Sequence, residues 1–266
     1  VPAKDNQNIY VTLGFMNSKI ADYMIALLNP TLNVTPIVIK KLPYTNTKEN
    51  SLIERTVLDN IEICKTDWDS FETSWDYNRH PLLSVIPRNA TLFDDTNDID
   101  LAECYTCWEN ECNERFNQLK DIYGLQDELT PEVEDKDVTV CKADLQRDIK
   151  SLISYAVGCM FGRYSLNVEG LVYAGGEWDD SKYTTFIPDV DNIIPIADEE
   201  YLEDDIVSRF CTWLKTAFGA KSLETNLDFI AKALGNKGDT SREIIRNYFL
   251  NDFFKDHCNT YSVTGS

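Results

Sequence analysis

Residues 142–161 decide the fold, with the sequence Lys-Ala-Asp-Leu-Gln-Arg-Asp-Ile-Lys-Ser-Leu-Ile-Ser-Tyr-Ala-Val-Gly-Cys-Met-Phe. The apolar residues of this segment recur at the spacing of a helix with one buried face. The buried stripe comprises Ile149, Leu152, Ile153, Ala156, Val157 and Met160. Gly158 and Gly162 carry no side chain, so another part of the chain could pack closely against them. We therefore expect an amphipathic helix that packs against further helices.

Similar spacing predicts further helices along the chain. They are expected over residues 50–64, from about 100 to 121, over 198–218, over 225–235 and from 240 onward. Gly219 would end the helix predicted over residues 198–218, because glycine readily adopts the backbone conformation that follows a helix. Thr240-Ser-Arg-Glu243 is a capping box, which is typical of a helix start. Between these helices, Leu171–Ala174 and Thr184–Ile187 are predicted to form a small hairpin.

The first 43 residues differ from this helical pattern. Residues 8–15 alternate in a way that favours a strand, and Asn17 or Ser18 would then cap a helix. Residues 34–39 form a β-branched run that reads as a second strand. Pro36 within it cannot donate a hydrogen bond to a neighbouring strand, which places it at a sheet edge. We expect a strand–helix–strand unit here.

These predictions define the expected fold class. The chain should be α+β but mainly α, with a small strand–helix–strand domain in residues 1–43. A large acidic helical domain with a minor hairpin should follow in residues 44–266.

Charge is distributed unevenly along the chain, whose net charge is −20. Residues 1–43 contain four lysines and two aspartates, a net of +2, so residues 44–266 carry −22. DNA binding depends on Lys and Arg displacing counterions from the phosphates, and an acidic surface opposes it. Any DNA contact is therefore expected in the first ~45 residues. The acidic remainder would keep the protein in solution, brace the fold or bind a basic partner.

Five polar side chains in the first segment are the candidates for contact with DNA phosphates. They are Asn17, Ser18, Lys19, Lys40 and Lys41. For each of them the alternative is a solvated surface residue with no ligand, and the sequence leaves that alternative open.

Three other patterns suggest chemistry but lack essential parts. Cys104, Cys107 and Cys112 fall within one predicted helix, whereas a zinc site takes about four ligands, usually from two separate pairs. The acidic residues 94–100 lack the glycine and the final glutamate of a calcium loop. Asn29-Pro30-Thr31 lacks the second proline and the aromatic residue with which adenine methyltransferases hold an extruded base. We interpret them as helix cysteines, a solvated loop and a helix stop.

The remaining sequence gives little material for catalysis. There are two histidines, His80 and His257, and neither a phosphate-binding nor a dinucleotide-binding glycine motif occurs. We therefore predict no catalytic, cofactor-binding or metal-binding residue. No apolar run approaches the ~20 residues that span a bilayer, so we expect no membrane contact and a cytoplasmic protein with reduced thiols. Both ends have the composition of cuts inside a longer chain.

Several longer motifs together resemble one family. They are Leu13–Lys19, Leu28–Asn33, Lys41–Pro43, Trp68–Asp76, Arg79–Leu82, Asp121–Glu132, Ile153–Ser165, Tyr173–Trp178, Asp205–Phe210 and Tyr248–Phe253. This set is similar to the carboxy-terminal region of the PglX-like adenine-specific DNA methyltransferases of BREX phage-defence systems. The resemblance covers nearly the whole chain. Residues 33–35 depart from the family's Asn-Phe-Gln, as they read Asn-Val-Thr.

The resemblance implies a role for each part of the chain. Residues 1–43 would be the end of a target-recognition domain, and the parent protein would use S-adenosylmethionine to methylate adenine in double-stranded DNA. The cofactor pocket and the catalytic loop would lie outside this fragment, which would support target recognition and bind partners, including other BREX components. The alternative is a freestanding acidic interaction module that imitates DNA.

Overall fold

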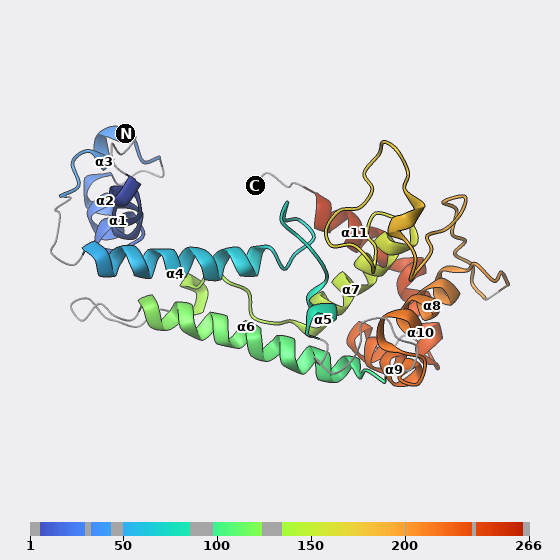
Figure 1. Ribbon diagram of the computed structural model, residues 1–266. Coiled ribbons are helices and arrows are strands. Elements are labelled where there is room, and N and C mark those ends of the chain that lie inside the picture. Colours follow the sequence, from blue (N-terminus) through green and yellow to red (C-terminus); the bar gives the residue numbers. More distant parts are fainter. Residues whose placement is uncertain are drawn as a thin grey trace. The chain divides into compact units, whose positions relative to one another are not determined.

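The computed structural model describes residues 6–29, 33–43, 50–85, 98–123, 135–199, 201–235 and 238–262. Within these ranges the chain consists of α-helices, short 3-10 helices and irregular segments, and no β-strand occurs in them (Figure 1). The dominance of helix is confirmed. The predicted strand–helix–strand unit in residues 1–43 and the predicted hairpin are wrong.

The two predicted strands of the first segment contain helices. Residues 8–15 belong to α1 (Asn6–Met16), and residues 34–39 contain the short helix α3 (Pro36–Ile39). Thr35 is the N-cap of α3, and Pro36 is its first residue. Proline suits this position because its fixed φ fits a helix and its missing N–H would have no helical partner there. Pro36 therefore begins a helix and does not lie at a sheet edge. The β-branched residues of this run are only a weak indication of a strand, because their preference depends on the surrounding packing.

The predicted hairpin falls in the irregular segment between α7 (Leu145–Met160) and α8 (Ile206–Phe218). Gly175 and Gly176 have φ angles of 110° and 98°, and such positive values bend the backbone away from an extended strand. The Thr185 N–H donates to the side-chain oxygen Oδ1 of Asn167 at 2.9 Å, and not to the carbonyl of a neighbouring strand. Some backbone groups of this segment are thus hydrogen-bonded without a neighbouring strand.

The chain forms two compact units, residues 1–66 with 115–141 and residues 67–114 with 142–266. The segment 1–43 lies inside the first unit, and a domain boundary at residue 43 stays a prediction. In the first unit, α2 (Lys19–Leu28) contacts both α1 and α3.

Most of α4 (Asn50–Trp68) and the end of α6 (Leu101–Tyr123) also belong to the first unit, as does a 3-10 helix, η1 (Asp135–Asp137). A small apolar core forms here from Phe116, Leu119, Val138 and Val140, with Ile63 and Cys64 packed against it.

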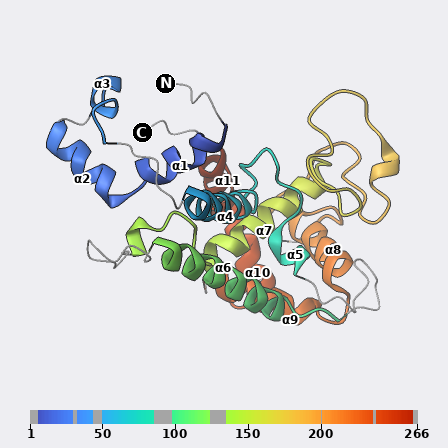
Figure 2. The same ribbon diagram turned by 60° about the vertical axis from the view of Figure 1, so that its left-hand side comes forward.

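The second unit is organised around α7, as the spacing of residues 142–161 predicted. α7 packs against α8, α9 (Leu223–Leu234) and α11 (Phe253–Tyr261). α10 (Ser241–Asn251) packs against α8, α9 and α11. In both views α8, α9 and α10 lie side by side next to α7 (Figures 1 and 2). The first part of α6, α5 (Pro81–Ser84) and the 3-10 helix η2 (Asp180–Lys182) complete this unit.

Two glycines allow close packing at the end of α7, as expected. A Cβ atom on Gly158 would lie 2.6 Å from Cδ2 of Tyr164, which is too close for any side chain. Gly162 has a φ of 73°, and a Cβ there would lie 2.5 Å from Cη2 of Trp178 and 3.5 Å from Cγ of Pro188. The start of the irregular segment therefore lies directly against the end of the helix.

The predicted capping box at the start of α10 is present. Thr240 Oγ1 accepts a hydrogen bond from the Glu243 N–H at 3.2 Å. The Glu243 carboxylate reaches back and accepts one from the Asp239 N–H at 2.9 Å. These contacts satisfy N–H groups that have no partner within the helix.

A buried ion pair joins the start of α8 to α10. Asp205 and Arg246 are 1% and 7% exposed, and two parallel hydrogen bonds of 2.7 Å connect their side chains. Asp205 also caps α8 by accepting the Val207 N–H at 3.0 Å, so the helix begins at Ile206 and not near residue 198 as predicted. Burial raises the pKa of Asp205, but the hydrogen bonds from Arg246 and Val207 outweigh it and hold that pKa below its usual value.

We predict that Arg246→Ala lowers the free energy of unfolding by about 3–5 kcal/mol, because it leaves the Asp205 carboxylate buried without a counterion. Arg242 provides a matched control one turn earlier on α10. It also pairs with a carboxylate through two bonds, but its side chain is 43% exposed and that of Glu224 is 68% exposed. Arg242→Ala should therefore cost about 1 kcal/mol or less. Urea unfolding followed by circular dichroism measures both, and equal losses would contradict the prediction.

Candidate functional site

The residues predicted to contact DNA lie in two short groups, both in the first unit. Asn17, Ser18 and Lys19 form the entry to α2, while Lys40 and Lys41 directly follow α3. All three lysines and Asn17 are exposed, and Ser18 is partly buried. The helices that carry the two groups, α2 and α3, contact each other. Contact of these residues with DNA stays a prediction.

Ser18 and Lys19 differ in what the local structure explains. Ser18 caps α2, because its Oγ accepts a backbone N–H from the first turn at 3.2 Å and donates to the Phe15 carbonyl at 2.7 Å. Lys19 is the first residue of α2, where the positive end of the helix dipole makes a cation mildly unfavourable. Asp22 in the same turn offsets this. Stabilisation of α2 therefore explains why a serine occupies position 18, but it does not explain why a lysine occupies position 19.

α2 also exposes an apolar stripe, which we define as Ile20, Tyr23 and Leu27. Their spacing puts them on one face of the helix, and they are 39%, 64% and 67% exposed. Ile37 on the neighbouring α3 is 67% exposed as well. Contiguous apolar surface of this kind usually marks a site of contact with another protein surface. The first unit therefore offers cations and an apolar face.

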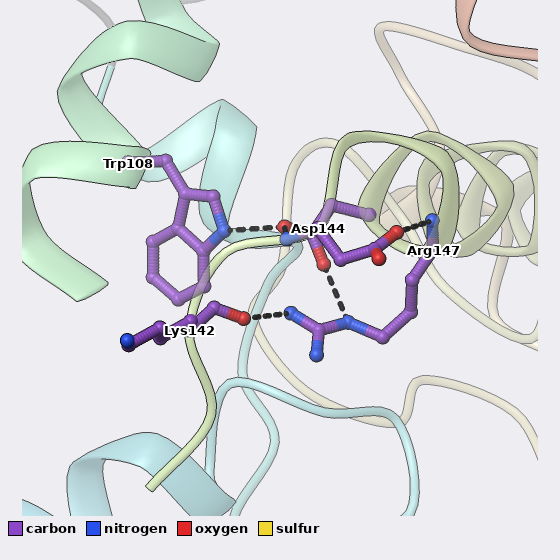
Figure 3. Close-up of polar contacts among 5 residues, drawn as sticks. Trp108, Lys142, Asp144 and Arg147 are labelled. Atoms are coloured by element: carbon purple, nitrogen blue, oxygen red, sulfur yellow. Dashed lines mark hydrogen bonds and ion pairs between the residues drawn. The ribbon is translucent and has the colours of Figure 1, made fainter. Parts of the chain in front are cut away.

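In the second unit, a polar cluster joins α6 to the start of α7 (Figure 3). Asp148, which is 5% exposed, accepts hydrogen bonds from Trp108 Nε1 at 3.1 Å and from Arg147 Nε at 2.8 Å. The backbone N–H of Asp144 donates to the same carboxylate at 3.1 Å, and Arg147 reaches the Lys142 carbonyl at 3.0 Å. The carboxylate is fully hydrogen-bonded, so it serves as a clamp between two helices.

A second buried cluster contains the residue types of a hydrolytic triad in a different order. Ser154 Oγ donates to Glu72 Oε2 at 2.9 Å and lies 3.4 Å from Nδ1 of His257. In a triad the histidine takes the serine proton and the carboxylate orients the histidine, whereas here the serine proton faces the carboxylate. Burial and nearby Arg163 lower the pKa of His257 despite Glu72. The arrangement connects α7 to α11 and does not activate a nucleophile.

The cysteines of α6 are placed as members of a helix. Cys104 and Cys112 are 2% and 1% exposed and face the apolar core, while Cys107 is exposed. Burial raises the pKa of Cys104 to about 12, so the thiol holds its proton at neutral pH. Among the described residues, no group of three or more His, Cys, Asp and Glu side chains is arranged to hold a metal ion.

Two of the patterns noted in the sequence lie partly outside the described ranges. These are the acidic residues 94–100 and the motif Asn29-Pro30-Thr31. In the described part of the chain, no helix is both long enough and apolar enough to span a bilayer.

Comparison with known proteins identifies relatives of the whole chain. PglX of Lacticaseibacillus casei (strain Zhang), an adenine-specific methyltransferase, is 43% identical over 276 residues, which cover 97% of this chain and 22% of PglX. BrxX of Escherichia coli O9:H4 (strain HS), also an adenine-specific methyltransferase, is 34% identical over 287 residues, 97% of this chain and 23% of BrxX. Nearly the whole chain thus corresponds to one region of the BREX adenine methyltransferases.

The resemblance to PglX-like proteins that the motifs indicated is confirmed, and the chain corresponds to their carboxy-terminal region. It spans less than a quarter of the length of PglX and BrxX. No family model matches the chain. The motif Asp121–Glu132 lies mostly outside the described residues, whereas Arg79–Leu82 and Ile153–Ser165 are described in full.

His80, which lies in the motif Arg79–Leu82, has a structural role. It is 2% exposed, and its Nδ1 accepts the Leu82 N–H at 3.3 Å, which caps α5. The ring proton must then sit on Nε2. Burial lowers the pKa of His80 to about 3, against a smaller opposite effect of a hydrogen bond with the Asp148 backbone. The folded protein therefore keeps this imidazole neutral.

We predict that stability falls as the pH drops below about 6.5, because the unfolded chain then protonates His80 while the folded chain does not until about pH 3. His80→Asn keeps an acceptor for the Leu82 N–H but removes the titration. Between pH 7 and pH 5 its unfolding free energy should depend less on pH, by at most about 1.4 kcal/mol per unit. Above pH 7 the difference between variant and parent should be constant. Identical slopes below pH 7 would contradict the assignment.

Proposed function

We propose that this chain is a non-catalytic, carboxy-terminal part of an S-adenosylmethionine-dependent DNA adenine-N6 methyltransferase in a cytoplasmic phage-defence system. The observation that carries the proposal is the match of 97% of the chain to both PglX and BrxX. The role within that enzyme would be to support target recognition and to bind other components of the defence system.

The polar clusters of the second unit support a non-catalytic role. Asp148, Asp205 and Glu72 are the buried acids with described partners, and each bonds to a neighbouring helix or segment. His80 caps a helix. A catalytic acid or base must instead face a substrate that can approach it. These groups are used in holding helices together.

The adjacent glycines Gly175 and Gly176 do not fit a site for S-adenosylmethionine. They follow no strand and precede no α-helix before Ile206. A Cβ atom on either would meet nothing within 4 Å, so these glycines do not cradle a group. Dinucleotide-type sites place such glycines between a strand and a helix. The proposal therefore assigns the methyl donor to the part of the enzyme outside this chain.

The first unit suits a role beside double-stranded DNA. Lys19, Lys40 and Lys41 are exposed on a segment with a net charge of +2, in a chain that is otherwise strongly acidic. The apolar stripe of α2 would pack against a neighbouring part of the enzyme, and the lysines would then face the phosphates.

An acidic module that imitates DNA is the second candidate, and the net charge of −20 favours it. Such a module would bind basic DNA-binding proteins without any other part of a methyltransferase. The two functions differ in whether the chain acts inside an enzyme that binds DNA. Variants of the exposed lysines in the first unit therefore distinguish them.

We predict that Lys19→Glu, Lys40→Glu and Lys41→Glu together weaken DNA binding by the full-length enzyme about tenfold or more at low salt. Each lost phosphate contact should also reduce the dependence of log K on log salt by about 0.9. The control variant reverses three exposed lysines of the second unit, Lys221, Lys232 and Lys255. It has the same net charge and should bind DNA nearly as the parent does. Equal affinities for both variants would dispose of the proposed contacts.

We also predict that the 266-residue chain alone neither binds S-adenosylmethionine nor methylates DNA, since its adjacent glycines, Gly175 and Gly176, do not fit the donor. Calorimetry with S-adenosylmethionine and transfer of a labelled methyl group to DNA measure the two activities. The full-length enzyme is the positive control in both assays. Methyl transfer by the isolated chain would refute the non-catalytic role.

A further inference from the structure

One irregular stretch of the second unit has an unusual composition. Residues 183–208 contain eight acidic residues and no lysine or arginine. Within it, residues 187–199 and 201–204 lie between η2 and α8, and we call them the acidic–apolar segment. This part of the chain loops outward from the helices in both views (Figures 1 and 2).

Large apolar side chains of the segment face solvent. Val190 is 97% exposed, and Ile187 and Ile193 are each 68% exposed. Tyr201 and Leu202 are 73% and 52% exposed. The transfer free energy of a Val or Ile side chain that stays in water is not recovered on folding, at about 1.5–3 kcal/mol each. The isolated fold therefore gains no burial energy from these side chains, and a partner that covers them would supply it.

The backbone of the segment is nevertheless fixed to the helices at several points. The Asp189 N–H donates to the Met160 carbonyl at the end of α7, at 2.8 Å. Arg209 on α8 donates to the Ile187 carbonyl at 3.0 Å, and Arg246 on α10 donates to the Ala197 carbonyl at 2.8 Å. These anchors come from three different helices, so the segment is held in place although it has no regular structure.

Local turns hold the most exposed part. The Asp189 carboxylate accepts the N–H groups of Asp191 and Ile193, at 3.2 and 3.3 Å, and Asp191 accepts the same Ile193 N–H at 2.9 Å. Asn192 adopts a φ of 58°, a value that asparagine tolerates better than most residues. Val190 and Ile193 are therefore presented on a turn whose shape does not depend on a ligand. Ordering a loop before binding removes an entropic cost from the binding step.

We propose that the acidic–apolar segment is a docking surface for a protein partner that presents an apolar contact surrounded by lysine and arginine side chains. Charge complementarity selects this partner. Asp198, Glu199, Glu203 and Asp204 are exposed and flank Tyr201 and Leu202 in the sequence, whereas Arg209 and Arg246 bond to backbone carbonyls of the segment. Nucleic acid and anionic membranes are repelled by the same carboxylates, and so is a second copy of the segment.

This inference goes beyond the proposed methyltransferase role and does not depend on it, because the segment is complete within the 266 residues. The two can therefore fail independently. A loss of the docking surface would leave DNA binding through the first unit unchanged.

The test uses the 266-residue chain and two defined probes, an amphipathic peptide of leucine and lysine and its counterpart with glutamate in place of lysine. Affinity is measured by calorimetry over a range of salt concentrations. The lysine peptide should bind and the glutamate peptide should not. Ile187→Ser, Val190→Ser and Ile193→Ser together should weaken binding about tenfold at every salt concentration, because the apolar contact is lost.

A second variant tests the contribution of charge, and in it asparagine or glutamine replaces Asp198, Glu199, Glu203 and Asp204. This variant should lose most of the salt dependence of binding while keeping the apolar contribution. Its matched control neutralises Asp59, Glu62, Glu109 and Glu111, which gives the same net charge from exposed positions on α4 and α6. The apolar control is Leu52→Ser, Leu58→Ser and Phe254→Ser, three residues that are 62%, 42% and 78% exposed.

The controls should bind the lysine peptide like the parent chain. If the controls weaken binding as much as the segment variants do, only the overall charge attracts the peptide and the proposal is wrong. Sedimentation of the chain should show no self-association through the segment, and a dimer that the serine variants dissociate would also overturn it. Circular dichroism confirms that each variant keeps its helices.

Discussion

The burial of α7 is the constraint on which the second unit depends. Ile149, Leu152, Ile153, Ala156 and Met160 are completely buried, and their apolar area is removed from water at about 25 cal/mol per Å². Every polar side chain that is buried along with this face then needs a hydrogen-bond partner. α6 supplies Trp108 for Asp148, and residue Glu72 supplies an acceptor for Ser154. The polar clusters are consequences of burying this helix.

Aromatic packing continues this core beyond the helix. Tyr155 stacks on Tyr164 with ring centroids 5.0 Å apart and meets Trp213 edge-on at 6.3 Å. The absence of a side chain at Gly158 makes room for Tyr164. The motif Ile153–Ser165, which carries part of the resemblance to PglX-like proteins, thus combines a buried stripe, a close approach and an aromatic stack. Most of its residues thus pack in the apolar core.

Local patterns predicted some elements and could not predict others. The period of the apolar residues gave α7, and Thr240 with Glu243 gave the start of α10, because both signals are contained within a few neighbouring residues. The strands predicted for residues 8–15 and around Pro36 are wrong, because a short alternating run and an early proline each fit either a strand or a helix. Net charge alone suggested where cations would be exposed.

The buried pairs were beyond reach of sequence reasoning. Asp205 and Arg246 are 41 positions apart, and Glu72 and Ser154 are 82 apart, so no local spacing relates them. Residues 198–204 of the acidic–apolar segment were likewise predicted to begin a helix, because acids suit the positive end of a helix. Its exposure became visible only when Asp205 proved to be the cap of α8.

The position of Trp178 gives the second unit an intrinsic fluorescent reporter. Its indole stacks on Tyr183 with centroids 4.6 Å apart, approaches the backbone at Gly162 beside Pro188, and is 44% exposed. Trp108 and Trp213 are buried at 5% and 0%, so they emit from an apolar, nearly constant environment. A change in the surroundings of Pro188 would alter the emission of Trp178 first. Trp178 is therefore an intrinsic optical reporter beside Pro188 in the acidic–apolar segment, once the exposed Trp68 and Trp75 are replaced with phenylalanine to remove their emission.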